Sequence, residues 1–374
     1  MKTSRLAVLL AAISAAALFA VYVFAQEGPQ QPSSDTVAKP RKPADTEAQP
    51  QQQQTIPSEY HKKDEVPEAT FRSNATTVSV DVAVLDNKGR FLPNIPADRF
   101  RILEDNVPQK IETNAKGEAP MTVCLLIEFS QKFQWYGGPT WQQTLVAAYG
   151  FAQILKKEDY IAVIAYDMKP EILSDFSTDR NKTYEALQRL RIPGFSEANL
   201  FDALVETEER MENIEGRKAI ILLASGVDTF SKLTFDKARK RIQEAGVPIF
   251  AISLMQALRI MAEGRMSGAQ DMTFLQADNQ MKTFARETGG QSYFPRFYGE
   301  FPSIYQSITE ALRNEYTFTY HPTNQARDGS FRHIKVELVN PATNEPLRVV
   351  DEKQKPIKYQ IIAKQGYKAP REVE

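Results

Sequence analysis

Cysteine is almost absent from this chain, which has Cys124 as its single example in 374 residues. One cysteine excludes an intrachain disulfide and any metal site built from several cysteines. Cys124 lies inside an apolar run, and we therefore expect a small buried side chain with no chemical role.

Histidine and glycine-rich motifs are also scarce. The three histidines, His61, His321 and His333, include no pair at metal-ligand spacing and no base for a catalytic triad. No Gly-x-Gly-x-x-Gly, Walker loop or nucleophile elbow occurs. The formal charge of -1 supplies no basic field for nucleic acid. Catalysis has little support, and no nucleic-acid partner is expected.

The first part of the chain is typical of an exported protein. Lys2 and Arg5 precede an apolar stretch over residues 6–25 that ends in an A-x-A-like pattern. Residues 1–25 are therefore predicted to be a secretory signal peptide or, because the stretch is long enough to span a bilayer, a membrane anchor. Residues 26–73 are rich in proline and glutamine and are predicted to be a disordered tether. Both alternatives predict a secreted, periplasmic or cell-envelope protein.

Two β-rich segments flank a longer central region. Residues 74–118 begin with an alternating run from Thr76 to Leu85, and residues 316–374 contain a second alternating run from Phe331 to Val339. Alternation of this kind indicates half-buried strands. Each segment is too short for a stable core of its own, so we expect the two to pack together as one small sheet.

The central region, residues 119–315, alternates apolar runs with helical patterns. This order predicts an α/β fold, a doubly wound and mostly parallel sheet with helices on both faces. The expected strands are Met121 to Ile127, Tyr160 to Tyr166, Lys218 to Ala224, Pro248 to Leu254 and Ser292 to Phe294. The expected helices are Thr140 to Lys156, Arg180 to Leu190, Leu200 to Met211, Phe235 to Ala245, Gln280 to Thr288 and Pro302 to Arg313.

The stretch around which this region is organised runs from Met121 to Gln134 and reads MTVCLLIEFSQKFQ. A continuous apolar run suits a strand buried on both faces. Glu128 and Ser130 follow it, and open α/β sheets bind ligands at the carboxyl ends of their strands. This stretch resembles the first strand of a von Willebrand factor A-type domain, whose metal site opens with Asp-x-Ser-x-Ser. The same positions here are Glu128, Ser130 and Lys132.

The resemblance extends along the chain. Leu200-Phe201-Asp202-Ala203-Leu204 resembles the family's Leu-x-Asp-Ala-Leu, which places the metal-binding threonine of the family at Ala198. The run from Leu222 to Asp228 resembles the third loop, which places the family's aspartate at Ser225. The flanking runs Phe100 to Asp105 and Tyr320 to Asn324 are similar to those of acidobacterial secreted proteins with this domain.

The resemblance implies a binding or adhesion module whose metal site is degenerate. Mg²⁺ needs several oxygen ligands in near-octahedral geometry, and Ala198, Ser225 and Lys132 remove oxygens or add a positive charge. We therefore expect no metal ion and no cofactor. Glu128 is expected to pair with Lys132 in the vacated position. Asp167, Glu197 and Asp228 on neighbouring loops remain alternative ligands for a weakly held cation.

Two stretches are candidates for partner contact. Phe133, Trp135 and Tyr136 follow the first strand, and aromatic residues of this kind are favoured at interface centres. The run from Met255 to Leu275, with Met261 and Met266, is predicted to be a partner-binding flap, since methionine suits adaptable contacts. Packing onto the sheet is the alternative for the aromatic residues, and a core-facing helix with a flexible tip is the alternative for the run from Met255 to Leu275.

These observations predict an extracytoplasmic, non-enzymatic module. It would bind a protein or a cell-surface polymer through loops at the carboxyl edge of the sheet, without a bridging metal. Two alternatives stay open. One is a structural component of an envelope assembly, and the other is a metal-assisted hydrolase that uses Glu128, Asp167 and Asp228.

Overall fold

The computed structural model describes residues 77–87, 89–115, 120–130, 138–190, 197–214, 216–253, 255–261, 266–350 and 355–371. The predicted signal peptide or anchor and the predicted tether lie outside these residues. None of the helices within the described part is both long enough and apolar enough to cross a bilayer.

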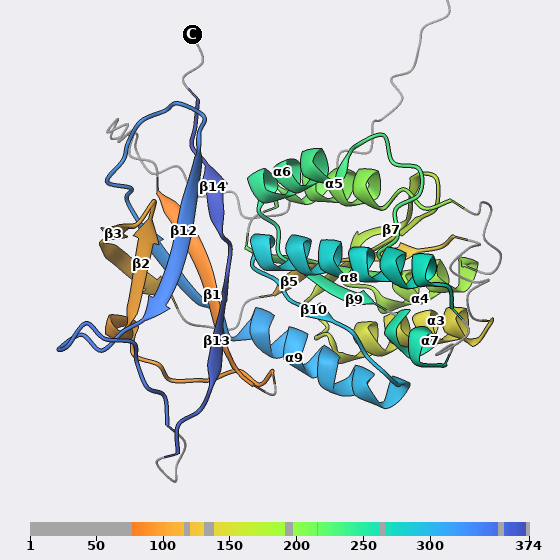
Figure 1. Cartoon of the computed structure of the whole chain (residues 1–374), viewed down its shortest axis with the longest axis horizontal. Helices are drawn as coiled ribbons and strands as arrows, with labels where there is room; N and C mark the ends of the chain where they lie inside the picture. The colour runs from red at the N-terminus through yellow and green to blue at the C-terminus, as the bar shows by residue number, and fades with distance from the viewer. Residues whose placement is uncertain are drawn as a thin grey trace, which may run out of the picture. The chain divides into compact units, whose positions relative to one another are not determined.

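A six-stranded sheet forms the α/β part, in the order β10-β9-β8-β5-β6-β7 (Figure 1). Its centre is β5 (Met121–Glu128), which pairs in parallel with β6 (Tyr160–Tyr166) and β8 (Arg217–Ala224). Strands β9 (Ile249–Ser253) and β10 (Ser292–Tyr293) extend the parallel set. The expected doubly wound, mostly parallel sheet is confirmed. The antiparallel end strand β7 (Pro170–Ser177) was not predicted, because its residues are only partly buried and carry little apolar periodicity.

Helices cover both faces of this sheet. Alternate side chains of β5 point to opposite faces of the sheet. Val123 and Leu125 belong to the apolar cluster on one face, and Cys124 and Leu126 to the cluster on the other. Figure 1 shows α5 and α6 on the opposite side of the sheet from α3 and α9. The first cluster includes residues of α3 (Gly138–Ile154), α4 (Arg180–Arg189) and α9 (Phe301–Arg313). The second includes residues of α5 (Leu200–Met211), α6 (Phe235–Ala245) and α8 (Gly268–Thr288).

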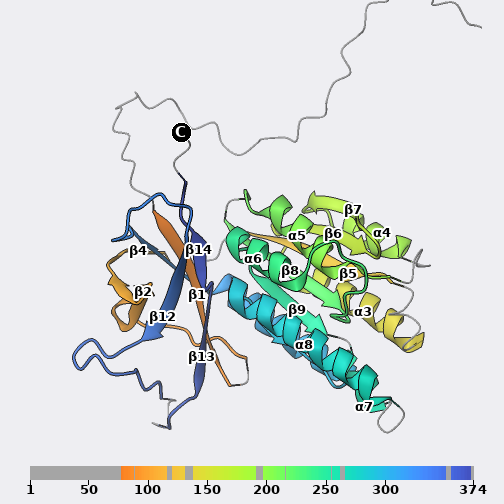
Figure 2. The same cartoon turned by 45° about the horizontal axis from the view of Figure 1, so that its top comes forward.

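The Met-rich connection after β9 is helical. It forms α7 (Met255–Met261) and α8, which starts at Gly268 and not near Gln280 as predicted. Ser267 explains the earlier start, since its side chain and that of Gln270 form a capping box. Figure 2 shows α8 as a long helix that continues well past the strands towards α7.

The two β-rich segments combine into two antiparallel sheets, not the single sheet expected. One has the order β13-β1-β11-β4 and the other β14-β12-β2-β3. The sheets enclose a shared core that includes Val80, Phe100, Phe318 and Ile334. The first contains β1 (Val78–Asp86), β4 (Ile111–Ala115), β11 (Tyr316–Tyr320) and β13 (Tyr359–Ala363). The second contains β2 (Phe100–Glu104), β3 (Val107–Gln109), β12 (Phe331–Leu338) and β14 (Gly366–Lys368).

Strand β1 belongs to two hydrophobic cores at once. Val82 and Val84 face the core between the antiparallel sheets, whereas Ala83 and Leu85 join the cluster that contains Ile308 of α9. The sequence predicted a half-exposed strand, but the second half of β1 is buried on both faces. The second face of β1 packs in the cluster that contains Ile308 of α9, which removes more apolar surface from water. This packing stabilises the β-rich part against α9.

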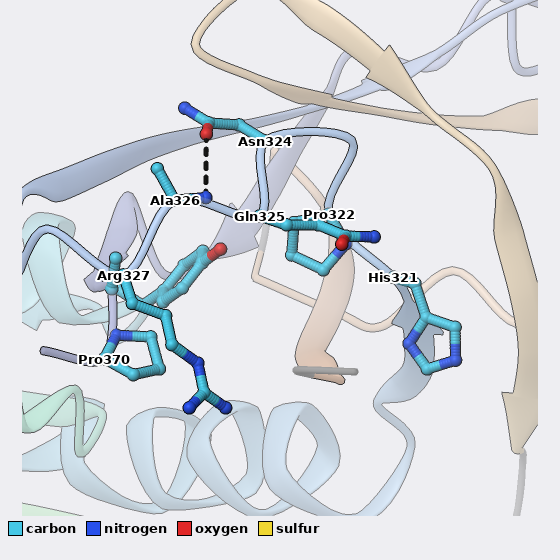
Figure 3. Close-up of a pocket in the computed structure, with 9 residues that line it drawn as sticks. His321, Pro322, Asn324, Gln325, Ala326, Arg327 and Pro370 are labelled. Atoms are coloured by element: carbon cyan, nitrogen blue, oxygen red, sulfur yellow. Dashed lines mark hydrogen bonds between the residues drawn. The ribbon is translucent and has the colours of Figure 1, made fainter. Parts of the chain in front are cut away.

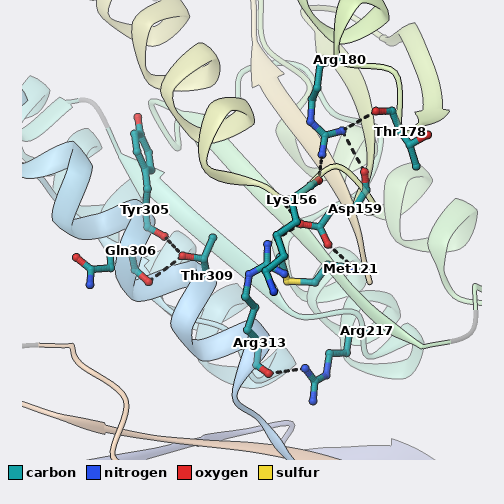
Figure 4. A network of polar contacts seen from close by, with 10 residues as sticks. All are labelled: Met121, Lys156, Asp159, Thr178, Arg180, Arg217, Tyr305, Gln306, Thr309 and Arg313. Carbon is teal, nitrogen blue, oxygen red and sulfur yellow. Dashed lines mark hydrogen bonds and ion pairs between the residues drawn. The ribbon is translucent and has the colours of Figure 1, made fainter. Parts of the chain in front are cut away.

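A buried carboxylate ties α9 to the base of the parallel sheet (Figure 4). Asp159 is fully buried and accepts hydrogen bonds from the backbone N–H of Met121, at 3.0 Å, and of Lys156, at 2.8 Å. The Nη2 atom of Arg313, from the end of α9, lies 2.6 Å from Asp159 Oδ2. These donors satisfy a charge that would otherwise be costly to bury. The network fixes the end of the sheet opposite the predicted binding edge.

Candidate functional site

The carboxyl ends of the parallel strands meet at one edge, which we call the rim. Glu128 ends β5, Tyr166 ends β6, Ser225 follows β8 and Ser253 ends β9. Ala198 precedes the first turn of α5, beside the loop that follows β8. The positions that the sequence singled out for a metal site, apart from Lys132, therefore lie together. Lys132 lies outside the described residues, and so does its expected ion pair with Glu128.

Glu128 is the buried centre of the rim. Its side chain is 2% exposed, and its carboxylate accepts three hydrogen bonds. Ser130 Oγ donates to Oε1 at 2.8 Å, and Ser225 donates to Oε2 through its backbone N–H and its Oγ, both at 2.7 Å. Glu128 thus bridges the ends of β5 and β8. We call this arrangement the carboxylate clasp.

Opposing electrostatic effects act on the pKa of Glu128. Burial raises the pKa of Glu128, the hydrogen bonds from Ser225 and Ser130 lower it, and the charge of Asp228 raises it again. Burial is the largest cause, and the net pKa lies above the ordinary value of a glutamate. The site therefore resists a full negative charge.

The donor set does not fit the divalent ion that the fold family implies. Glu128 supplies the one carboxylate of the clasp, and its oxygens already accept protein hydrogen bonds. Ala198 offers no side-chain oxygen. Across the described residues, no group of three histidine, cysteine, aspartate or glutamate side chains could hold a metal ion. Mg²⁺ needs several oxygen ligands in near-octahedral geometry, which these residues do not supply.

Asp228, an alternative metal ligand predicted from the sequence, accepts hydrogen bonds from neighbouring protein groups. Its Oδ1 accepts hydrogen bonds from the backbone N–H of Phe201 at 3.2 Å and from Ser231 Oγ at 2.5 Å. The Phe201 amide belongs to the first turn of α5, where an acidic side chain is favourable. Burial is the main cause of a raised pKa at Asp228. Its carboxylate thus serves to fasten a loop to a helix.

Hydrogen bonds join the neighbouring rim loops to each other. Ala198 N–H donates to Thr229 Oγ1 at 2.8 Å, and Thr229 N–H donates to the carbonyl of Ala198 at 2.9 Å. The backbone N–H of Asn199 donates to the carbonyl of Asp167 at 2.8 Å, and Asp167 Oδ1 accepts from Lys169 N–H at 3.4 Å. The rim loops that follow β6 and β8 are therefore held in place by the loop that precedes α5.

Two residues of this site were missed from the sequence. Tyr166 pairs with Glu128 across β5 and β6 and is 1% exposed. Burial, followed by the charges of Glu128 and Asp228, raises its pKa. Thr229 supplies the hydroxyl that holds Ala198. Register between β5 and β6 would have indicated Tyr166, but no local pattern marks Thr229.

The structure describes only some of the side chains predicted to contact a partner. Phe133, Trp135 and Tyr136 lie outside the described residues. The side chain of Met261 is likewise not described, and Met266 is partly buried against the core under α3 and α9. The large apolar side chains that α7 and α8 expose are Ile260 at 44%, Leu275 at 45% and Met272 at 66%.

Helices α7 and α8 are fixed to the rim by an ion pair. Arg259 Nη1 of α7 lies 3.0 Å from Asp278 Oδ2 of α8, and Ser253 Oγ at the end of β9 donates to Asp278 Oδ1 at 3.4 Å. Asp278 is largely buried, and burial raises its pKa even though Arg259 lowers it. The exposed apolar side chains of α7 and α8 are therefore presented on an anchored support.

A separate pocket lies in the β-rich part, beside the loop after β11 (Figure 3). Its volume is about 20 Å³, and Asn324 Oδ1 accepts a hydrogen bond from Ala326 N–H at 3.1 Å within it. Its lining residues are His321, Pro322, Asn324, Gln325, Ala326, Arg327, Tyr367, Ala369 and Pro370. None of these is a predicted site residue or an acid, and we assign the pocket no function.

The family model of the von Willebrand factor type A domain matches residues 123–288. No curated protein matches the chain in sequence. Among solved structures, the vWF domain of the type V pili tip protein Mfa5 from Porphyromonas gingivalis is 13% identical, with a TM-score of 0.39, over 53% of this chain and 97% of that one. An aerotolerance-related membrane protein from Bacteroides fragilis is 12% identical, with a TM-score of 0.38, over 51% of this chain and 99% of that one. The PilB minor pilin from Streptococcus sanguinis is 12% identical, with a TM-score of 0.35, over 52% of this chain and 63% of that one.

Proposed function

Residues 123–288 form a von Willebrand factor type A domain, and from this premise we propose that the chain is an extracytoplasmic, non-enzymatic binding or adhesion module. It recognises a protein or a cell-surface polymer through the rim and the adjoining faces of α7 and α8. It does so without a bridging metal ion.

The carboxylate clasp is the observation that carries this proposal. A bridging metal ion needs side-chain oxygens that are free to coordinate it. The Glu128 oxygens instead accept hydrogen bonds from Ser130 and Ser225. Displacing these donors would leave the buried N–H of Ser225 without a partner, which costs about 1–3 kcal/mol. Recognition must therefore use shape, apolar contact and hydrogen bonds from the surrounding surface.

The surface proposed for the partner is the apolar face of α7 and α8. Met272 and Leu275 are three residues apart on α8 and lie on the same side of it, since residues at that spacing are neighbours on a helix. Exposed apolar side chains on a fixed support suit an interface centre, because the backbone that presents them is already ordered before binding.

The same contacts disfavour the hydrolase alternative. Both oxygens of Glu128 accept hydrogen bonds from Ser130 or Ser225, and the carboxylate of Asp228 holds Phe201 and Ser231. A carboxylate that acts as a general base needs access to a substrate proton or to water. Both side chains serve instead to keep the rim in one conformation.

The proposal is tested by capture of partners from the native envelope on the immobilised full chain. Leu275→Glu is compared with Ile172→Glu, because these side chains are 45% and 46% exposed and lie on α8 and on β7 at the other end of the sheet. We expect Leu275→Glu to reduce capture at least about tenfold and the control to leave it unchanged.

Metal dependence is tested in the same assay. Capture should be equal in Mg²⁺ and in excess chelator. A partner held only in the presence of Mg²⁺ would contradict the proposed mechanism, and equal capture by both variants would contradict the proposed surface.

A further inference from the structure

A groove lies beside two strands that each end a sheet. Strand β10 is the last strand of the six-stranded sheet, and β13 is the last strand of one antiparallel sheet. The groove has a volume of about 220 Å³ and a third wall from α8. Its lining residues are Lys282, Arg286, Gly290, Gln291, Ser292, Gln360, Ile361, Ile362, Ala363 and Gln365. We call it the edge groove.

The pairing register of β10 shows which of its backbone groups face the groove. Ser292 is the residue paired with Ala251 of β9, and Ala251 N–H donates to the carbonyl of Gln291 at 2.9 Å. In a parallel ladder with this pattern, the N–H and C=O of the paired residue face away from the neighbouring strand. The backbone groups of Ser292 therefore face the open side of β10.

The register of β13 leads to the same conclusion for Ile361. Ile361 lies opposite Val84 of β1, but the carbonyl of Val84 accepts from Leu92 N–H at 2.7 Å on the other side of β1. The two residues are therefore not a hydrogen-bonded pair, and the N–H and C=O of Ile361 face outward. Beyond the end of β13, Gln365 donates its N–H to the carbonyl of Glu287 at 3.2 Å and accepts from Ile334 N–H at 2.8 Å, so this end of the groove is already occupied.

The helical wall of the groove is positively charged. Lys282 and Arg286 lie one turn apart on α8, and the groove is lined by no acidic residue. Arg286 is 65% exposed and its ion pair with Glu287 is long, at 3.7 Å. Glu287 already accepts from Arg239 at 2.5 Å and 2.6 Å. Lys282 Nζ lies 4.8 Å from the centroid of the Phe294 ring, so both cations have nearby partners, but no carboxylate lines the groove itself.

The groove is closed at one end. A Cβ atom added to Gly289 would lie 2.5 Å from the backbone N of Lys364, so the two backbones are in direct contact there. An occupant must enter from the Gln360 end and lie along β13.

We propose that the edge groove binds an extended acidic segment of a partner protein. The segment adds to β13 as a further strand, accepts and donates hydrogen bonds at Ile361, and pairs its carboxylates with Lys282 and Arg286. Unpaired strand edges are templates for such addition, in which backbone hydrogen bonds give affinity and side chains give selectivity. This surface is separate from the rim and does not depend on its function.

The test uses fluorescence anisotropy with the full chain and a short labelled peptide that alternates valine and glutamate. A second peptide keeps the glutamates but has proline at every valine position, which removes the amide donor at each of those positions and prevents regular strand pairing. The charge variant is Lys282→Gln with Arg286→Gln. Its matched control is Lys237→Gln with Lys240→Gln, which removes two exposed lysines from α6.

We expect the valine–glutamate peptide to bind, the proline peptide to bind at least about tenfold more weakly, and the groove variant to lose about tenfold in affinity. The α6 control should bind like the unaltered chain. Amide hydrogen exchange over Tyr359–Ala363 should slow when the peptide is bound. Equal binding of both peptides would show attraction by charge alone, as for an acidic polysaccharide, and would overturn the proposal. Failure of the first peptide to bind, or unchanged affinity of the groove variant, would overturn it as well.

Discussion

Glu128 Oε2 lies 2.7 Å from both the backbone N and the Oγ of Ser225, so one carboxylate oxygen joins the ends of β5 and β8. These residues are 97 positions apart in the chain. The reach depends on side-chain length, because an aspartate at position 128 would stop one methylene short.

The clasp predicts an unusual ranking of substitutions at position 128. Glu128→Asp should destabilise the fold by about 1–3 kcal/mol, since the buried N–H of Ser225 loses its acceptor. Glu128→Gln should remain within about 1 kcal/mol of the unaltered chain, because the amide oxygen can accept from Ser225 while the Ser130 hydroxyl turns to accept from the amide N–H. Urea denaturation measures both. A more stable aspartate variant would contradict the clasp.

Restoring the family's ligand set should create a metal site. The combined variant Glu128→Asp, Lys132→Ser, Ala198→Thr and Ser225→Asp supplies oxygens of the kind that Mg²⁺ prefers. Titration calorimetry with Mg²⁺ and Mn²⁺ should detect binding to this variant and none to the unaltered chain. Tight binding of either ion by the unaltered chain would show that the clasp opens to accept a cation.

Glu208 predicts a pH dependence of stability. It is buried, and burial raises its pKa well above the ordinary value of 4.5 despite the charge of Lys218. A raised folded-state pKa means that the folded chain holds its proton more tightly than the unfolded chain. The stability contribution is therefore full below the unfolded-state pKa and is lost as pH rises towards the folded-state pKa.

Glu208→Gln should remove this loss. Its free energy of unfolding relative to the unaltered chain should increase from pH 5 upward, by at most about 1.4 kcal/mol per pH unit. Denaturant titrations across that range measure the difference. Glu206→Gln on the exposed face of α5 is the control and should show no such trend. A difference that stays constant with pH would contradict the assignment to Glu208.

The Asp159–Arg313 pair should contribute far more to stability than a surface pair. Arg313→Ala leaves the fully buried Asp159 without its cation and should cost about 3–5 kcal/mol. Arg210→Ala breaks the exposed pair with Asp175 and should cost less than about 1 kcal/mol. Thermal and urea unfolding compare the two. Similar costs would indicate that the Asp159 charge is already satisfied by Met121 and Lys156.

The sequence predicted the site in part. The apolar run of β5 placed Glu128 and Ser130 at the carboxyl end of a central strand, and parallel strands brought Ala198, Ser225 and Asp228 to the same edge. Within the described residues the hydrogen bonds of Glu128 come from Ser130 and Ser225, whereas its predicted ion pair with Lys132 lies outside them and stays a prediction. Spacing along the chain cannot say which of several neighbouring donors a long side chain will reach.

The sequence by itself determined that the central region forms a mostly parallel sheet covered by helices, because burial leaves an apolar pattern in each segment. Alternation marked β1 and β12, and the continuous run marked β5. Only the tertiary structure decided that the β-rich segments divide into two sheets, that α9 buries the second face of β1, and that β10 and β13 end beside one groove. These outcomes depend on which distant segments pack against each other. The packing free energy is a property of a pair of segments, so the sequence of one segment alone cannot predict it.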